Sequence, residues 1–93
     1  MSEKIQYHLI VHGRVQGVFF RAETCRAAKN LNITGWVKNL ADGTVEAVIE
    51  GKEKDVQQML AWCKKGSPLS SVNKIELKKN SSISGFTKFE TKL

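Results

Sequence analysis

Two glycines and two arginines lie close together in residues 13–21, which read Gly-Arg-Val-Gln-Gly-Val-Phe-Phe-Arg and end at Arg21. Glycines let a backbone turn tightly and let another group approach its amides, and successive inward-pointing amides form an anion-binding nest. The stretch leads into a predicted helix, whose N-terminus also favours anions. Arg21 falls at that helix start, where a cation is unfavourable unless an anion is shared between its guanidinium and the amides. The spacing therefore favours a phosphate-binding loop.

A simpler interpretation of the same residues stays open at this point. Two glycines and an arginine could also belong to an ordinary strand-to-helix turn with a solvated side chain. The stretch lacks the Gly-Lys-Ser/Thr of a Walker loop, and it lacks the third glycine of a dinucleotide-binding fingerprint. Spacing alone excludes these two phosphate-binding motifs but does not decide between a plain turn and an anion site.

Hydrophobic periodicity predicts the elements that would hold this loop. Residues 5–11 alternate as a strand with Tyr7, Leu9 and Val11 on one face. Residues 20–31 follow a helical pattern that ends at Asn32, a residue type that tolerates left-handed backbone. A Gly-Ser-Pro sequence at residues 66–68 ends a second predicted helix. The remaining predicted elements are that helix at 51–65 and strands at 33–38, 44–50, 72–78 and 86–93.

The order of these elements predicts one domain over residues 1–93 with an α+β fold. An Asp42–Gly43 turn joins the second and third strands as a hairpin. In the third strand, alternation places Val45, Ala47 and Ile49 inward and Glu46 and Glu50 outward. The βαββαβ order, followed through the polar loop at 80–85, predicts a ferredoxin-like antiparallel sheet with both helices on one face.

Two motifs in this order resemble the signature of the acylphosphatase family. The first is the stretch at residues 13–21, and the second runs from Gly35-Trp-Val-Lys-Asn39 through Asp42-Gly-Thr-Val45 to Gly51. The resemblance covers the whole chain, including the Gly-Ser-Pro sequence after the second helix. Ala22 departs from the pattern, because the family often has a larger side chain there, so the rim of the site is expected to differ.

The resemblance implies hydrolysis of acyl phosphates to a carboxylate and inorganic phosphate. Arg21 would bind the phosphoryl oxygens in a fork, and Asn39, at the end of the second strand, would hold the attacking water. The same oxygens would be cradled by the backbone amides of Arg14, Val15, Gln16, Gly17 and Val18. The expected partners are therefore a small acyl phosphate and its phosphate product, with no metal and no cofactor.

This implied chemistry agrees with the residue types present. The leaving carboxylate has a pKa of about 4 to 5, judged from side-chain carboxyl groups, so it departs without a general acid. A phosphoryl oxygen can accept the proton of water, so a general base is not required. Positioning and charge stabilisation remain, and phosphoryl transfer depends mainly on these.

Composition and charge leave two other classes to weigh. Fifteen Lys and Arg against nine Asp and Glu give a net charge of +6, which attracts anions. The charge is scattered, and the predicted sheet lacks the aromatic pattern of an RNA-binding module while carrying Glu46 and Glu50 on its outer face. We therefore expect no nucleic-acid partner. A regulatory or docking domain of a larger enzyme is a third alternative, which the short chain disfavours.

The two cysteines and the chain start complete these expectations. Cys25 and Cys63 lie far apart without a CxxC motif, so we expect neither a zinc site nor a disulfide. No apolar run approaches the roughly 20 residues of a membrane helix. The first residues, Met-Ser-Glu-Lys-Ile, have no apolar signal segment, which favours a cytoplasmic protein that does not bind membranes. Nothing in the sequence requires more than a monomer.

Overall fold

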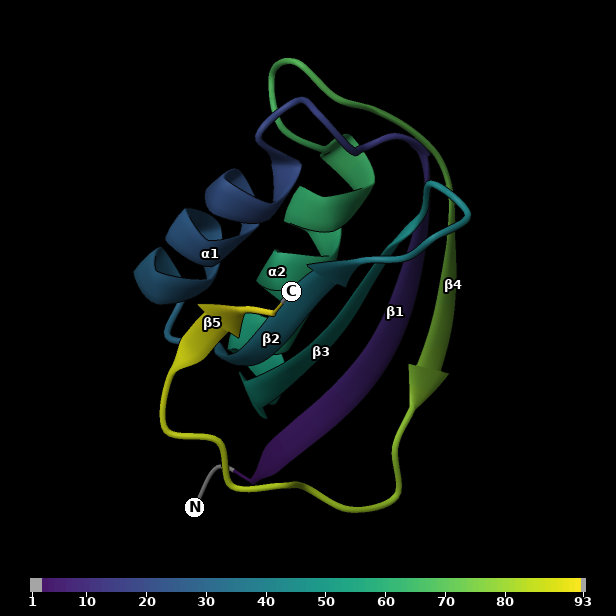
Figure 1. The fold of residues 1–93 in the computed structure, drawn as a ribbon. Coiled ribbons are helices and arrows are strands. Elements are labelled where there is room, and N and C mark those ends of the chain that lie inside the picture. Colours follow the sequence, from purple (N-terminus) through teal and green to yellow (C-terminus); the bar gives the residue numbers. More distant parts are fainter. Residues whose placement is uncertain (1–2, 93) are drawn as a thin grey trace.

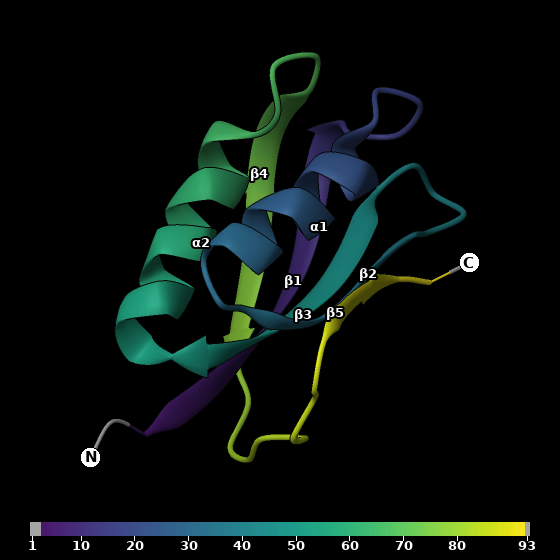
Figure 2. The same ribbon diagram turned by 90° about the vertical axis from the view of Figure 1, so that its left-hand side faces the viewer.

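A five-stranded sheet forms one layer of the protein and two helices form the other. The computed structural model describes residues 3–92. The strands are β1 (Lys4–Arg14), β2 (Thr34–Asn39), β3 (Val45–Lys52), β4 (Ser71–Lys79) and β5 (Phe89–Thr91), in the sheet order β4-β1-β3-β2-β5. The helices α1 (Phe20–Asn30) and α2 (Glu53–Lys65) cover the same face of this sheet (Figures 1 and 2). The predicted ferredoxin-like α+β fold is confirmed.

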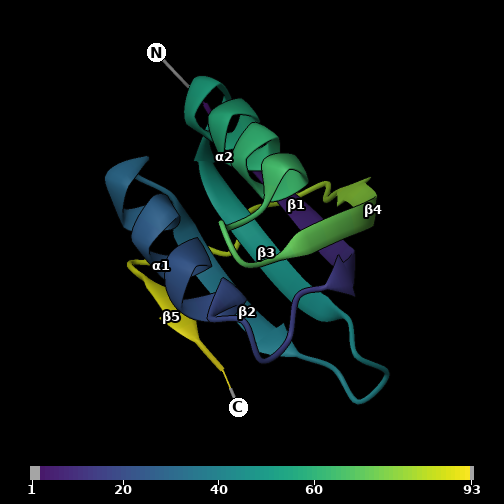
Figure 3. The same ribbon diagram turned by 90° about the horizontal axis from the view of Figure 1, so that it is seen from above.

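The hydrophobic core lies between the two layers, whose arrangement the view from above shows (Figure 3). Leu9 and Val11 of β1 and Ile49 of β3 point into it, as their alternation predicts. Phe20 begins α1 inside this core, and its ring centroid lies 5.7 Å from that of Trp62 on α2. The buried start of α1 fixes the position of the loop that precedes it.

The local signals that were to end or join elements act as predicted. Asn32 has φ 59° after α1, which is the left-handed conformation expected there. Residues 40–44 join β2 and β3 as an antiparallel hairpin. The second helix ends at Lys65, directly before Gly66. These boundaries depend on residues close together in sequence, which is why periodicity and turn chemistry found them.

The sheet is mixed rather than wholly antiparallel, because β5 runs parallel to β2. The chain leaves β4 at one edge of the sheet and crosses to the opposite edge before β5 begins (Figure 1). After this crossing the chain forms β5 beside β2 and runs in the same direction as β2. The strand itself is restricted to Phe89–Thr91, shorter than the predicted residues 86–93, of which residue 93 lies outside the described part of the chain.

Gly13 belongs to β1 and not to the loop in which the sequence placed it. The pairing of β1 with β4 shifts register between His12 and Gly13, as in a β-bulge. A Cβ at Gly13 would lie 2.0 Å from the carbonyl oxygen of Ser71, and φ is 130°. A glycine is therefore required here by the close approach of β4, and the anion-loop argument applies only to Gly17.

The crossing segment is held to the sheet by Glu50, which the sequence placed outward. Its carboxylate lies on the face opposite the helices but is completely buried. Its two oxygens accept hydrogen bonds from Gln6 Nε2 at 2.8 Å and from the amides of Ser84, Gly85 and Phe86 at 2.7, 3.0 and 3.1 Å. The segment thus covers this end of the open face because Glu50 supplies the acceptors for its amides.

These hydrogen bonds set the ionisation of Glu50. Burial by itself raises the pKa of Glu50, but the bonds from the Ser84 amide, Gln6 and the other two amides outweigh it. The pKa therefore lies below its ordinary value of 4.5. A group with a depressed folded-state pKa stabilises the fold above the unfolded pKa, and that stabilisation is lost as the pH falls through the folded value.

We predict that Glu50→Gln lowers the free energy of unfolding by about 1–3 kcal/mol at pH 7, because an amide NH₂ then faces the donors. The difference from wild type should shrink as the pH falls below 4.5, where the wild-type carboxylate itself becomes protonated. Urea denaturation between pH 3 and pH 7 measures both effects.

A matched control is Glu90→Gln, because Glu90 is exposed and pairs only loosely with Lys88. This change should leave unfolding within about 1 kcal/mol of wild type. Parallel stability curves for Glu50→Gln and wild type across this pH range would contradict the assigned role of Glu50.

Candidate active site

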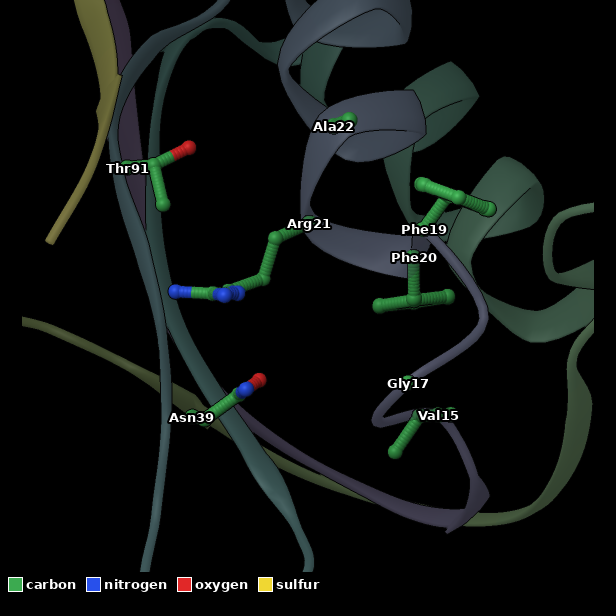
Figure 4. A pocket seen from close by; sticks show the side chains of 8 residues that line it. All are labelled: Val15, Gly17, Phe19, Phe20, Arg21, Ala22, Asn39 and Thr91. Carbon is green, nitrogen blue, oxygen red and sulfur yellow. The ribbon is translucent and has the colours of Figure 1, made fainter. Parts of the chain in front are cut away.

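A hollow of about 370 Å³ opens between the β1–α1 loop, the start of α1 and the ends of β2 and β5. It is the place where the two residues expected to carry the chemistry, Arg21 and Asn39, come together (Figure 4). Its lining is Val15, Gly17, Phe19, Phe20, Arg21, Ala22, Asn39 and Thr91. The hollow therefore joins segments from near both ends of the chain.

The loop between β1 and α1 is anchored from inside. Val15 and Val18 are buried in the hydrophobic core, whereas Gly17 between them is exposed with φ 72°. This left-handed conformation is the one for which glycine is favoured. Of the residues expected to cradle phosphate, Val15 and Gly17 line the hollow, and Arg14, Gln16 and Val18 do not.

The start of α1 is left without a side-chain cap. Phe19 occupies the N-cap position with φ 62°, and its side chain makes no capping hydrogen bond. The first amides of a helix have no partner within the helix, and they lie at the positive end of its dipole. The wall of the hollow formed by α1 therefore favours an anion.

Gln16 ties this loop to the hairpin that follows β2. Its Nε2 donates to the carbonyl oxygens of Leu40 and Thr44, both at 2.8 Å. The hairpin is itself ordered, because Asp42 Oδ1 accepts from the amide of Thr44 at 3.0 Å and from its hydroxyl. These two bonds hold the pKa of Asp42 below its ordinary value. The sequence assigned Gln16 only through its amide, and its side-chain role was missed.

Arg21 extends its guanidinium from α1 across the hollow toward β2 and β5 (Figure 4). Its one hydrogen bond within residues 3–92 is a long contact of 3.5 Å from Nη1 to the carbonyl oxygen of Lys92. The ion pairs of the described chain involve Arg26 but not Arg21. The guanidinium thus keeps most of its donors for a ligand, and its planar fork suits a phosphate.

Asn39 ends β2 and directs its carboxamide into the same space (Figure 4). Its Oδ1 is buried, and no group within residues 3–92 donates a hydrogen bond to it. A buried acceptor without a donor costs about 1–3 kcal/mol, so native proteins seldom keep one without a reason. An acceptor of this kind beside a guanidinium suits a ligand that can donate a hydrogen bond, such as water.

The remaining candidate groups lie elsewhere or form no cluster. Within the described residues, no three His, Cys, Asp or Glu side chains come together as metal ligands do, and no helix is long and apolar enough to cross a membrane. Both cysteines are free thiols. Cys25 Sγ lies 3.0 Å from Thr91 Oγ1, and burial raises the pKa of Cys63 to about 12.

Two further residues of the hollow were not assigned a role in the site from the sequence. Thr91 reaches the hollow only because β5 lies beside β2, and no local sequence pattern predicts this pairing. Phe19 lies at the rim of the hollow and is 74% exposed. A bulky residue in a glycine-rich loop was the only signal for it.

Comparison with known proteins agrees with this geometry. The pattern that describes the acylphosphatase family matches residues 7–91. The acylphosphatase of Syntrophobacter fumaroxidans is 48% identical over 95% of this chain and 91% of its own length. The corresponding values for that of Synechococcus are 51%, 82% and 81%.

Two solved structures resemble the fold closely. The acylphosphatase of Bacillus subtilis superimposes with a TM-score of 0.92 at 40% identity, covering 96% of this chain and 99% of the other. The HypF protein of T. kodakarensis superimposes with a TM-score of 0.83 at 36% identity, but the match covers only 12% of that longer chain. The match over residues 7–91 and the identity to complete relatives show that the chain belongs to the acylphosphatase family.

Proposed function

We propose that this hydrolase of acyl phosphates works by holding the phosphoryl group and one water molecule in a fixed arrangement. Arg21 and the amides of residues 14–18 bind the phosphoryl oxygens, and Asn39 orients the water. The observation that carries the proposal is the buried Oδ1 of Asn39, which accepts no hydrogen bond from residues 3–92 and lies in the hollow that Arg21 enters. A carboxamide oxygen accepts a hydrogen bond from the water and so directs a lone pair of the water oxygen toward phosphorus.

The proposed reaction is an in-line displacement at phosphorus. The water oxygen forms a bond to phosphorus while the bond from phosphorus to the acyl oxygen breaks. A phosphoryl oxygen takes the proton of the water, and the products are a carboxylate and inorganic phosphate. Arg21 and the amides stabilise the charge on the equatorial oxygens, and the acidic leaving group needs no proton. The proposal thus assigns no step to a metal or a cofactor.

Nucleic-acid binding is less well supported. The open face of β1 and β3 carries His8, Ile10, Glu46 and Val48, with Glu50 buried beneath the crossing segment. Base stacking on such a sheet depends on aromatic side chains at these positions. The expectations of a cytoplasmic monomer that binds neither nucleic acid nor membranes stay predictions; size-exclusion chromatography tests the oligomeric state.

Arg21→Ala should lower kcat/KM for benzoyl phosphate by at least about 10²- to 10³-fold, the usual effect of removing one preorganised donor. The inhibition constant of inorganic phosphate should rise as well, because the phosphate loses its fork. Loss of benzoyl phosphate absorbance, measured with and without a chelator, follows the reaction. Turnover near the wild-type rate would remove Arg21 from this role.

Asn39→Ala should lower kcat for benzoyl phosphate to a similar extent but leave phosphate inhibition nearly unchanged, because its partner is the water. The pair of variants separates phosphate binding from water positioning. Circular dichroism checks that both stay folded. Equal weakening of phosphate inhibition in the two variants would contradict the separate assignment of Asn39.

Gln16→Ala should raise the inhibition constant of phosphate and KM by about 10-fold, because the loop loses its two bonds to the hairpin and must be ordered by the ligand. Gln16→Glu tests the same bonds, since a carboxylate cannot donate to the carbonyl oxygens of Leu40 and Thr44. A loss of thermal stability with unchanged phosphate inhibition would mean that Gln16 is only structural.

A further inference from the structure

Phe19 combines two features that the fold does not explain. Its φ of 62° is uncommon for a bulky residue and strains the backbone. Its ring is also 74% exposed, so little packing offsets that strain. The neighbouring Phe20 makes the core contact with Trp62 instead. Strain of this kind persists mainly at sites where it serves binding or catalysis.

The position of Phe19 relative to Asn39 places its ring on the side of the hollow where the leaving acyl group would lie. Both residues line the hollow, and Figure 4 shows Phe19 on the side away from Asn39, with Arg21 reaching across the space from α1. An in-line displacement places the leaving group on the side of phosphorus opposite the attacking water. With the water at Asn39, the acyl group extends toward Phe19 and Ala22.

The chemistry of the lining on this side is apolar. Of the eight described lining residues, Arg21 is the one with a charge, and the phosphoryl group engages it. Val15, Phe19, Phe20 and Ala22 contribute hydrocarbon surface. No second cation among these residues would compensate a charged acyl group. Ala22 is an exposed small residue on the first turn of α1, so it leaves room beside the ring.

We propose that Phe19 and Ala22 form an acyl-binding subsite that selects acyl phosphates with an apolar, preferably aromatic, acyl group. The ring of Phe19 is the surface on which a flat acyl group stacks, and Ala22 provides the space for it. The subsite rests on the proposed function, because it takes its direction from the placement of water at Asn39. Aromatic pairs prefer offset or edge-to-face contact, which an exposed ring at a rim permits.

The contact lies away from the reacting bonds, so it stabilises bound substrate and transition state equally. Such uniform binding lowers KM and leaves kcat unchanged. Inorganic phosphate has no acyl group and does not touch the subsite. A role of Phe19 in the acyl subsite is therefore separable from any role in the phosphate cradle by comparing two substrates and one inhibitor.

The test compares benzoyl phosphate with acetyl phosphate in Phe19→Gly and Phe19→Asn. Both replacements suit the left-handed backbone at this position, so they remove the ring without adding strain. The ratio of kcat/KM for benzoyl over acetyl phosphate should fall by about 5- to 20-fold, through KM for benzoyl phosphate. The inhibition constant of inorganic phosphate should change by less than about 2-fold.

Three further variants complete the test. Phe19→Tyr keeps the ring and should keep the wild-type ratio. Ala22→Leu should lower the ratio by occupying the space beside the ring. Leu69→Ala is the matched control, because Leu69 is also an exposed apolar residue, at 64%, but lies outside the hollow. It should leave the ratio unchanged.

An unchanged ratio in Phe19→Gly and Phe19→Asn would overturn the subsite, as would equal losses on both substrates together with weaker phosphate inhibition. The latter result would place Phe19 in the phosphate cradle. Failure of the proposed function looks different, because Arg21→Ala and Asn39→Ala would then keep the wild-type turnover of both substrates.

Discussion

The double hydrogen bond from Gln16 to the carbonyl oxygens of Leu40 and Thr44 is the contact on which the site depends. It joins the loop that precedes α1 to the hairpin that follows β2. The loop includes the amides proposed to bind phosphate and leads to Arg21, and β2 ends at Asn39. Together with the burial of Val15 and Val18, this amide side chain holds a segment whose backbone favours an anion beside a buried carboxamide oxygen.

The wall of the hollow that β5 forms depends on Glu50, whose carboxylate lies on the opposite face of the sheet. Glu50 accepts hydrogen bonds from three backbone amides and from the Gln6 side chain. These bonds hold the segment that crosses from β4 to the other edge of the sheet. Because of that crossing, β5 lies parallel to β2 and brings Thr91 to the hollow and the carbonyl of Lys92 to Arg21. A buried carboxylate far from the chemistry thus shapes the site through the chain path.

Three local rules of folding are broken at the hollow. Asn39 keeps a buried oxygen without a donor within the described residues, Arg21 puts a cation at a helix start, and Phe19 adopts a left-handed backbone with its ring in solvent. Each of these three features is unfavourable for the stability of the protein by itself. Several such conflicts gathered at one place are typical of a functional site, where ligand interactions offset the local cost.

The sequence by itself determined the order of elements, the β2–β3 hairpin, the end of α2 and the position of the loop before Arg21. These follow from periodicity and turn chemistry, which act between neighbours. Only the tertiary structure decided the parallel β5, the burial of Glu50, the need for Gly13 against Ser71 and the side-chain role of Gln16. Each depends on residues far apart in the chain, such as Glu50 and Ser84, whose meeting no local pattern encodes.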